Sequence, residues 1–189
     1  MTICQILHVC LLRNFLLPIE LRVLITNFVF CKLTNKTIKD AVRNYYEADS
    51  NIKYRYGLME WWDTSEVTDV SKLFYRNKCK SDISNWDVSS VTTMEMMFCE
   101  LCSFNQPLDK WDVSNVRNMK NMFENVWEFN QPLAKWNVSA VTNMDSMFYL
   151  AVDFNQPLDT WNVSNVVSMN NMFNHAKMFN QPLGNWNVS

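Results

Sequence analysis

Glycine is scarce in this sequence, and its scarcity excludes one class of binding site. The chain has 189 residues but only two glycines, Gly57 and Gly184. Neither stands in a Gly-x-Gly-x-x-Gly or P-loop pattern, in which glycines let the backbone approach a phosphate closely. The glycine-rich nucleotide-binding motifs are therefore excluded.

Histidine is equally rare, which argues against catalysis. His8 and His175 lie in unrelated segments, so no set of nucleophile, base and orienting residue can be assembled around them. A row of carboxylates and carboxamides recurs along the chain, but a regular row gives its members equal environments, whereas an acid and base pair needs two different pKa values. Its members are Asp63, Asp87, Asp112, Asn137, Asn162 and Asn187. We expect no enzymatic activity and no cofactor.

A basic surplus and a long uncharged apolar run are also missing. The formal net charge is −2, which gives no reason to expect a nucleic-acid partner. The first 33 residues are apolar, but Arg13, Glu20 and Arg22 divide them into pieces shorter than a membrane-spanning helix needs. No basic region precedes this run, as it would in a signal peptide. We expect an intracellular, cytoplasmic protein without a membrane span, with a surface or secreted location as the alternative.

The six cysteines do not complete a metal site. Cys99 and Cys102 form a C-x-x-C, which is half of a zinc motif, but no second pair of ligands occurs at a useful spacing. We therefore expect no metal, and unpaired thiols fit a reducing compartment best.

What the sequence does contain is a repeat. The words FNQPLDKWDVS, FNQPLAKWNVS, FNQPLDTWNVS and FNQPLGNWNVS begin at residues 104, 129, 154 and 179, always 25 residues apart. Two more divergent copies come earlier, at 83–98 and 61–74. A fixed period of this length is typical of stacked repeat proteins. We expect a solenoid of about five repeats over residues 57–189.

Each repeat has the pattern of one short strand and one short helix. The KWDVS segment alternates polar and apolar residues, which predicts a parallel strand; the strand centres are Val88, Val113, Val138, Val163 and Val188. The residues Val116, Met119, Met122 and Phe123 then follow the spacing of a helical face. A serine precedes each such face and is interpreted as its N-cap: Ser65, Ser89, Ser114, Ser139 and Ser164. The predicted fold is an α/β repeat solenoid with one strand and one helix per repeat.

Stacking at this period should align identical residues in columns. We expect Trp111, Met122, Phe123 and Phe129 to be buried. Two aromatic columns are predicted, Phe104, Phe129, Phe154 and Phe179, and Trp86, Trp111, Trp136, Trp161 and Trp186. A carboxamide ladder should satisfy backbone groups in the turns; it consists of Asn105, Asn130, Asn155 and Asn180.

The repeat words resemble a known family. WDVSNV, M-x-x-MF and FNQPL, with their lead-in, are similar to the BspA-type leucine-rich-repeat-related proteins, a domain first noticed in mycoplasma surface proteins. The resemblance covers residues 33–189. It implies an α/β solenoid used for surface attachment or protein binding, without catalytic residues.

The N-terminal segment, residues 1–56, is expected to be helical and to form a cap. Its stretch LLPIELRVLITNF, residues 16–28, is similar to the opening helix of an F-box, which would dock a ubiquitin-ligase core. The alternative is an amphipathic helix that closes the open end of the solenoid, and both can hold together. The docking residues are Leu17, Pro18, Glu20, Leu21, Ile25 and Phe28.

Positions that vary between copies are the candidates for partner binding, because the repeated columns are fixed by stacking. They are Lys120, Glu124, Trp127, Asp145, Tyr149, Leu150, Asn174 and His175. We expect a non-enzymatic scaffold that binds a protein partner, an intracellular adaptor if the N-terminal segment docks as an F-box does. The alternative is an exported or surface-attached adhesin. The open C-terminal edge is predicted to be either a self-association surface or the cut edge of a longer ancestral array.

Overall fold

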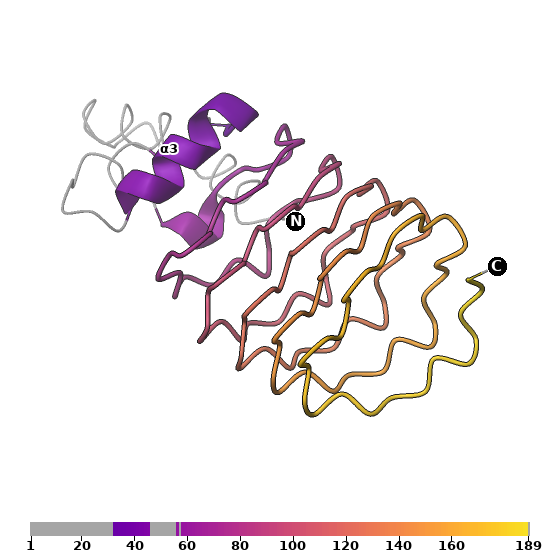
Figure 1. Ribbon diagram of the computed structural model, residues 1–189. Helices are drawn as coiled ribbons and strands as arrows, with labels where there is room; N and C mark the ends of the chain where they lie inside the picture. Colours follow the sequence, from indigo (N-terminus) through magenta and orange to yellow (C-terminus); the bar gives the residue numbers. More distant parts are fainter. Residues whose placement is uncertain (1–31, 46–55, 57, 189) are drawn as a thin grey trace, which may run out of the picture.

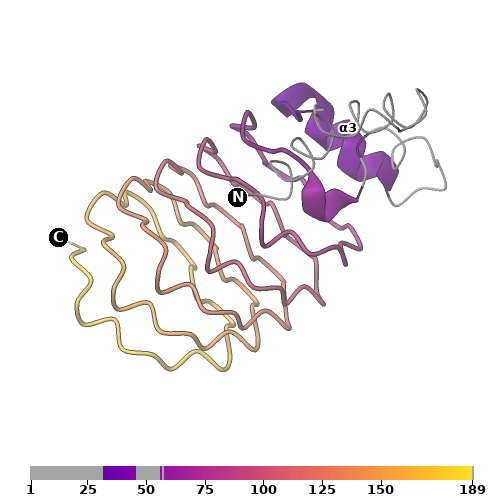
Figure 2. The ribbon, with the colours of Figure 1, turned by 180° about the vertical axis from the view of Figure 1, so that it is seen from behind.

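A helix followed by a row of stacked coils makes up the part of the chain that the computed structural model describes (Figure 1). The structure describes residues 32–45, 56 and 58–188. Helix α3 (Asn35–Tyr45) lies at one end of the row and the C-terminus at the other, and the 3-10 helix η1 (Met59–Trp61) leads into the coils. Figure 2 shows the coils side by side from behind.

Helix α3 covers the end of the stack at which the first coil lies. Its buried residues Ile38, Ala41, Val42 and Tyr45 have the spacing of one helical face. The Asn35 side chain accepts hydrogen bonds from the backbone N–H groups at positions 68 and 69, at 2.8 and 3.0 Å. The contact covers backbone and apolar groups at this end of the stack. Residues 1–31 and 46–55, with the F-box-like stretch, lie outside the described residues.

The predicted strand and helix of each repeat are wrong. Within the described residues, the segments centred on Val88, Val113, Val138 and Val163 form no strand, and no helix follows any of the five serines. Parallel pairing is limited to isolated bridges, which join Asp69, Thr93, Asn118, Asn143 and Ser168 in order. The described repeats therefore form no sheet, and the chain is not an α/β solenoid with a strand and a helix per repeat.

Left-handed backbone positions explain why no helix forms. Two residues in each coil, four apart, have positive φ between 52° and 63°, although none is glycine. A right-handed helix cannot continue through such residues. They are Lys72, Arg76, Met96, Glu100, Asn121, Asn125, Ser146, Leu150, Asn171 and His175.

Backbone hydrogen bonds run between coils at these positions instead of along a helix. Every second N–H group of one coil donates to a carbonyl of the next coil. In one coil the donors are Met119, Asn121, Phe123 and Asn125, and the N···O distances to the next coil are 2.7–2.9 Å. The intervening N–H groups bond within their own coil, as Met122 N does to Met119 O at 3.2 Å. Each coil is therefore held both by its own turns and by its neighbour.

The serines have a different role from the predicted N-cap. The Ser89 N–H and Oγ–H both donate to Asp87 Oδ1, at 3.0 and 2.6 Å. Ser139 makes the same two bonds to Asn137. The acidic and amide row therefore forms a series of Asx turns, in which a side chain caps a backbone turn two residues on.

The predicted columns are confirmed. Trp111, Met122, Phe123 and Phe129 are at most 3% exposed. The rings of Phe104, Phe129, Phe154 and Phe179 stack on one another, with centroids 5.9–6.1 Å apart. Each indole of the tryptophan column also donates its Nε1–H to a carbonyl about one coil earlier; Trp136, for example, bonds Leu108 O at 2.9 Å.

The carboxamide ladder also forms as predicted. Asn130 Oδ1 accepts from the backbone N–H of Asn155 at 3.0 Å and from Nε2 of Gln156 at 2.9 Å. The same three-residue arrangement joins each FNQPL copy to the next. Phenylalanine, tryptophan and asparagine thus repeat because each contacts its own counterpart in the adjacent coil.

Candidate interaction surface

The varying positions gather on one edge of the stack. This edge consists of segments 99–103, 124–128, 149–153 and 174–178, and is called the variable edge below. The backbone places these segments in register: Glu128 N donates to Cys102 O at 3.1 Å, Asp153 N to Trp127 O at 3.0 Å, and Met178 N to Val152 O at 3.0 Å.

Six of the eight predicted partner-binding residues lie on the variable edge. Trp127, Asn174 and His175 are exposed. The other three are half-buried: Glu124, Tyr149 and Leu150. The Tyr149 and His175 rings meet edge to face, with centroids 5.9 Å apart.

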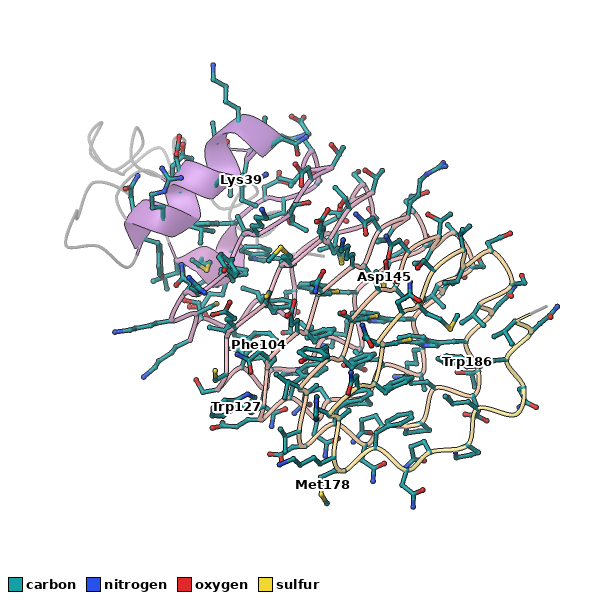
Figure 3. All side chains as sticks on the ribbon, in the orientation of Figure 1. Lys39, Phe104, Trp127, Asp145, Met178 and Trp186 are labelled. Atoms are coloured by element: carbon teal, nitrogen blue, oxygen red, sulfur yellow. The ribbon has the colours of Figure 1, made fainter. Side chains whose placement is uncertain are left out.

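Lys120 and Asp145 do not join this group. These two residues occupy equivalent positions in neighbouring coils. Figure 3 shows Asp145 on a different side of the stack from Trp127. Asp145 Oδ1 accepts from Ser168 Oγ at 2.5 Å and from the Asn170 N–H at 2.8 Å. The Ser168 bond is the main reason why the pKa of the Asp145 carboxyl lies below its usual value. This carboxylate therefore connects two coils.

Trp127 is the largest exposed side chain of the variable edge. Its side chain is 51% exposed, and the indole Nε1–H donates to the side-chain oxygen of Asn125. Asn125 has a left-handed backbone, with φ of 58°, and its side chain meets that of Trp127 two residues further along the chain. The bond holds the ring on the outside of the stack (Figure 3).

Met178 is a further member of this edge that the sequence analysis did not name. It is 57% exposed and, like Trp127, lies on the outer edge of the coils in Figure 3. The signal was present in the repeat alignment, because Met178 replaces Ser103, Glu128 and Asp153 of the earlier copies. An apolar residue in an otherwise polar column identifies it.

At the N-terminal end of the same edge an ion pair connects the first two coils. Arg76 Nε and Nη2 donate to the Glu100 carboxylate at 2.8 and 3.0 Å, and the Tyr75 hydroxyl donates to it at 3.2 Å. The Arg76 bond is the main cause that lowers the pKa of the Glu100 carboxyl. This carboxylate is thus already engaged within the chain.

The C-x-x-C pair holds two free thiols. Cys99 is buried and Cys102 half-buried. Burial, together with the Glu124 carboxylate, raises the pKa of the Cys99 thiol to about 12, so it is not a nucleophile at neutral pH. Across residues 32–45, 56 and 58–188, no group of three or more His, Cys, Asp or Glu side chains is placed to hold a metal ion.

The N-terminal docking residues predicted between Leu17 and Phe28 lie outside the described residues, so the structure does not place them. In the described part of the chain, no helix has the length and apolar character that crossing a membrane requires.

Comparison with known proteins identifies one related family. Residues 37–151 and 125–189 match the sequence profile described as "Mycoplasma protein of unknown function, DUF285". No curated protein and no solved structure matches the chain. The two matched ranges overlap and together reach from α3 to the last coil.

Proposed function

The chain belongs to the DUF285 family of mycoplasma-type proteins of unknown function, and we propose that it is a non-enzymatic repeat scaffold that binds another protein through its variable edge. The likeness of the repeat words to BspA-type repeats favours protein binding, which that resemblance implies. The observation that carries the proposal is Trp127, whose large ring stays half exposed in coils whose other repeat tryptophans are packed.

An exposed, oriented tryptophan is the usual anchor of a protein interface. Tryptophan contributes a large apolar area and loses little side-chain freedom on binding, because it has only two rotatable bonds. Here the Asn125 bond already restricts the ring. Tyr149, Leu150 and Met178 add apolar area on neighbouring coils, and polar residues surround them. An apolar centre with a polar rim is the composition of a protein-binding surface.

Photo-crosslinking tests this proposal. p-Benzoylphenylalanine is placed at position 127 in one variant and at position 110 in a control, because Lys110 is also exposed but lies off the variable edge. In extracts of the source organism, position 127 should give a discrete crosslinked protein and position 110 should not. Equal labelling at both positions would refute the proposal.

The adaptor role extends the proposal to residues 16–28. Replacing Leu17 and Leu21 by Asp should remove a second partner that the F-box-like stretch binds, while the crosslink at position 127 remains. Fractionation separates this role from the alternative adhesin role, because recovery of the protein outside the cell, or glycosylation at Asn137 or Asn162, favours the adhesin.

A further inference from the structure

The middle of the variable edge carries negative charge only. Segments 99–103, 124–128 and 149–153 contain no Lys or Arg. They hold the carboxylates of Glu100, Glu124, Glu128 and Asp153. The corresponding segments at both ends of the stack differ, because Arg76 and Lys78 lie in the first and Lys177 in the last. The acidic region is therefore confined to the three coils around Trp127.

Two of the four carboxylates are already satisfied within the chain. Glu100 binds Arg76 and Tyr75, and Glu124 accepts from the side-chain amide of Asn121. Glu128 and Asp153 are exposed, and no described residue forms an ion pair or a side-chain hydrogen bond with either. These two remain available to a partner.

The residues that carry the two available carboxylates adjoin Trp127 in the backbone. Glu128 directly follows Trp127 in the chain, and the Asp153 N–H bonds the Trp127 carbonyl from the next coil at 3.0 Å. The face of an indole attracts a cation within about 6 Å, and Arg and Lys are the cations that proteins supply. The same edge holds the two available carboxylates and, in these three coils, no Lys or Arg, so the ring and the charge both favour a basic group.

Met178 indicates the direction in which a partner segment would cross the coils. It stands in the same column as Glu128 and Asp153, on the coil that follows them. A partner segment that crosses the coils in line would place its basic residue at Trp127 and an apolar residue at Met178. Both contact points are more than half exposed in the chain alone.

From this juxtaposition we infer that the variable edge binds a basic segment of a partner protein, with a Lys or Arg over the Trp127 ring between Glu128 and Asp153, and an apolar side chain against Met178. This inference rests on the proposed function and adds the chemistry of the partner. Nucleic acid is not the occupant, because the same carboxylates repel its phosphates.

Fluorescence anisotropy with two labelled peptides tests the inference. One peptide alternates arginine and leucine over ten residues, and the other has glutamate in place of arginine. The full chain should bind the basic peptide and not the acidic one, and the affinity should fall with added salt, since exposed charges are screened. Equal binding of both peptides would overturn the inference.

Charge-neutral variants locate the binding. E128Q/D153N should weaken binding of the basic peptide about tenfold, and W127A should weaken it at least as much. The control E60Q/D159N makes the same change in net charge off the variable edge and should bind as the wild type does. Unchanged binding by E128Q/D153N, or an equal loss in the control, would overturn the inference.

The crosslinking experiment separates the inference from the function on which it rests. A crosslink at position 127 that persists in the E128Q/D153N background would leave the scaffold function standing and refute the basic partner. A crosslink lost in that background and kept in E60Q/D159N supports both.

Discussion

Two tryptophans of the same chain show how position decides the role of a residue. Trp136 is 3% exposed, stacks parallel to Trp161 with ring centroids 6.5 Å apart, and bonds Leu108 O. Trp127 has the same side chain but stands in a column that also contains Cys102, Val152 and Lys177. A column of identical residues is a packing contact, whereas a column of unlike residues is free to serve binding.

Replacing each tryptophan by alanine should therefore change the free energy of unfolding by very different amounts. Trp136→Ala should lower the free energy of unfolding by about 3–5 kcal/mol, because a large buried ring leaves a cavity. Trp127→Ala should lower it by less than about 0.5 kcal/mol, since the side chain is largely exposed. Urea denaturation measures both. A loss below about 1 kcal/mol for Trp136→Ala would mean that the column is not packed.

Cys99 gives a pH-dependent prediction at the same scale. Burial and the nearby Glu124 raise the pKa of its thiol to about 12, whereas an unfolded thiol titrates near about 8.5. The folded state thus keeps the proton longer, so this contribution to stability is full below about pH 8.5 and is lost as the pH rises toward 12. The wild type should lose more stability than Cys99→Ala between pH 8 and 10.

Iodoacetamide labelling checks the same thiol directly. At pH 8 the folded chain should be modified at the half-buried Cys102 well before Cys99, as followed by peptide mass spectrometry. Equal rates at the two cysteines would contradict the buried, proton-retaining thiol.

At the scale of the element, the pair of left-handed residues in each coil replaces the helix that the sequence predicts. The apolar spacing of Val116, Met119, Met122 and Phe123 does identify the buried face, because all four are buried. The same spacing fits a backbone in which left-handed residues recur four positions apart, so periodicity alone cannot distinguish this backbone from a helix. Asn121 and Asn125 tolerate positive φ, but Met96 and Leu150 at equivalent positions hide that signal.

A glycine at one of these positions should stabilise the chain. Ser146 has φ of 52° and is half-buried, and Ser146→Gly removes the steric cost of the left-handed conformation. We expect the free energy of unfolding to rise by about 0.5–1 kcal/mol. Ala134→Gly is the control, since Ala134 does not have positive φ and should lose stability. Destabilisation by both changes would contradict the left-handed geometry.

The carboxamide ladder permits a comparison between two identical residues. Asn130 Oδ1 accepts bonds from Asn155 and Gln156, whereas Asn180 Oδ1 has no donor among the described residues. Asn130→Ala should cost about 1–2 kcal/mol more than Asn180→Ala, because it removes two hydrogen bonds between coils. Thermal or urea unfolding measures the difference. Equal costs would show that the ladder does not stabilise the stack.

At the scale of the whole molecule, the 25-residue period predicts more of the structure than the residue pattern within one repeat does. The 25-residue spacing is sufficient to predict the stack, the aromatic columns and the Asn ladder, since each depends only on like residues meeting. Helix and N-cap depend on hydrogen bonds within one repeat, and those bonds have other partners: Ser89 N–H bonds Asp87, and Phe123 N–H bonds Met147 O of the next coil. The strand depends on a continuous ladder between repeats, of which isolated bridges alone form in the described residues. For the candidate site, variation between copies indicated Trp127, but its bond to Asn125 required the coordinates.

The last described coil gives the prediction for the molecule as a whole. Several apolar residues of this coil are only partly buried, although the equivalent residues of the preceding coil are buried. The partly buried residues are Val166, Met169, Phe173, Phe179, Leu183 and Trp186. The chain as printed should therefore dimerise through this face. Leu183→Lys should abolish dimers in sedimentation equilibrium, and Val167→Lys, on the exposed side of the same coil, should not. A monomeric wild type at high micromolar concentration would contradict this.

The inter-coil hydrogen-bond ladder makes the stack electrically polar. In the coil that contains Met119, four alternate N–H groups donate to the following coil, whereas those of Arg117 and Glu128 donate to the preceding one. The peptide dipoles of the four groups add from coil to coil, as they do along a helix, and the other two oppose them in part. In the last described coil the N–H groups of Met169, Asn171, Phe173 and His175 meet no acceptor among the described residues, which makes that face the positive pole. Two such poles cannot satisfy each other's donors, so a dimer formed there is held by side chains, and only a segment that brings carbonyl oxygens can extend the ladder.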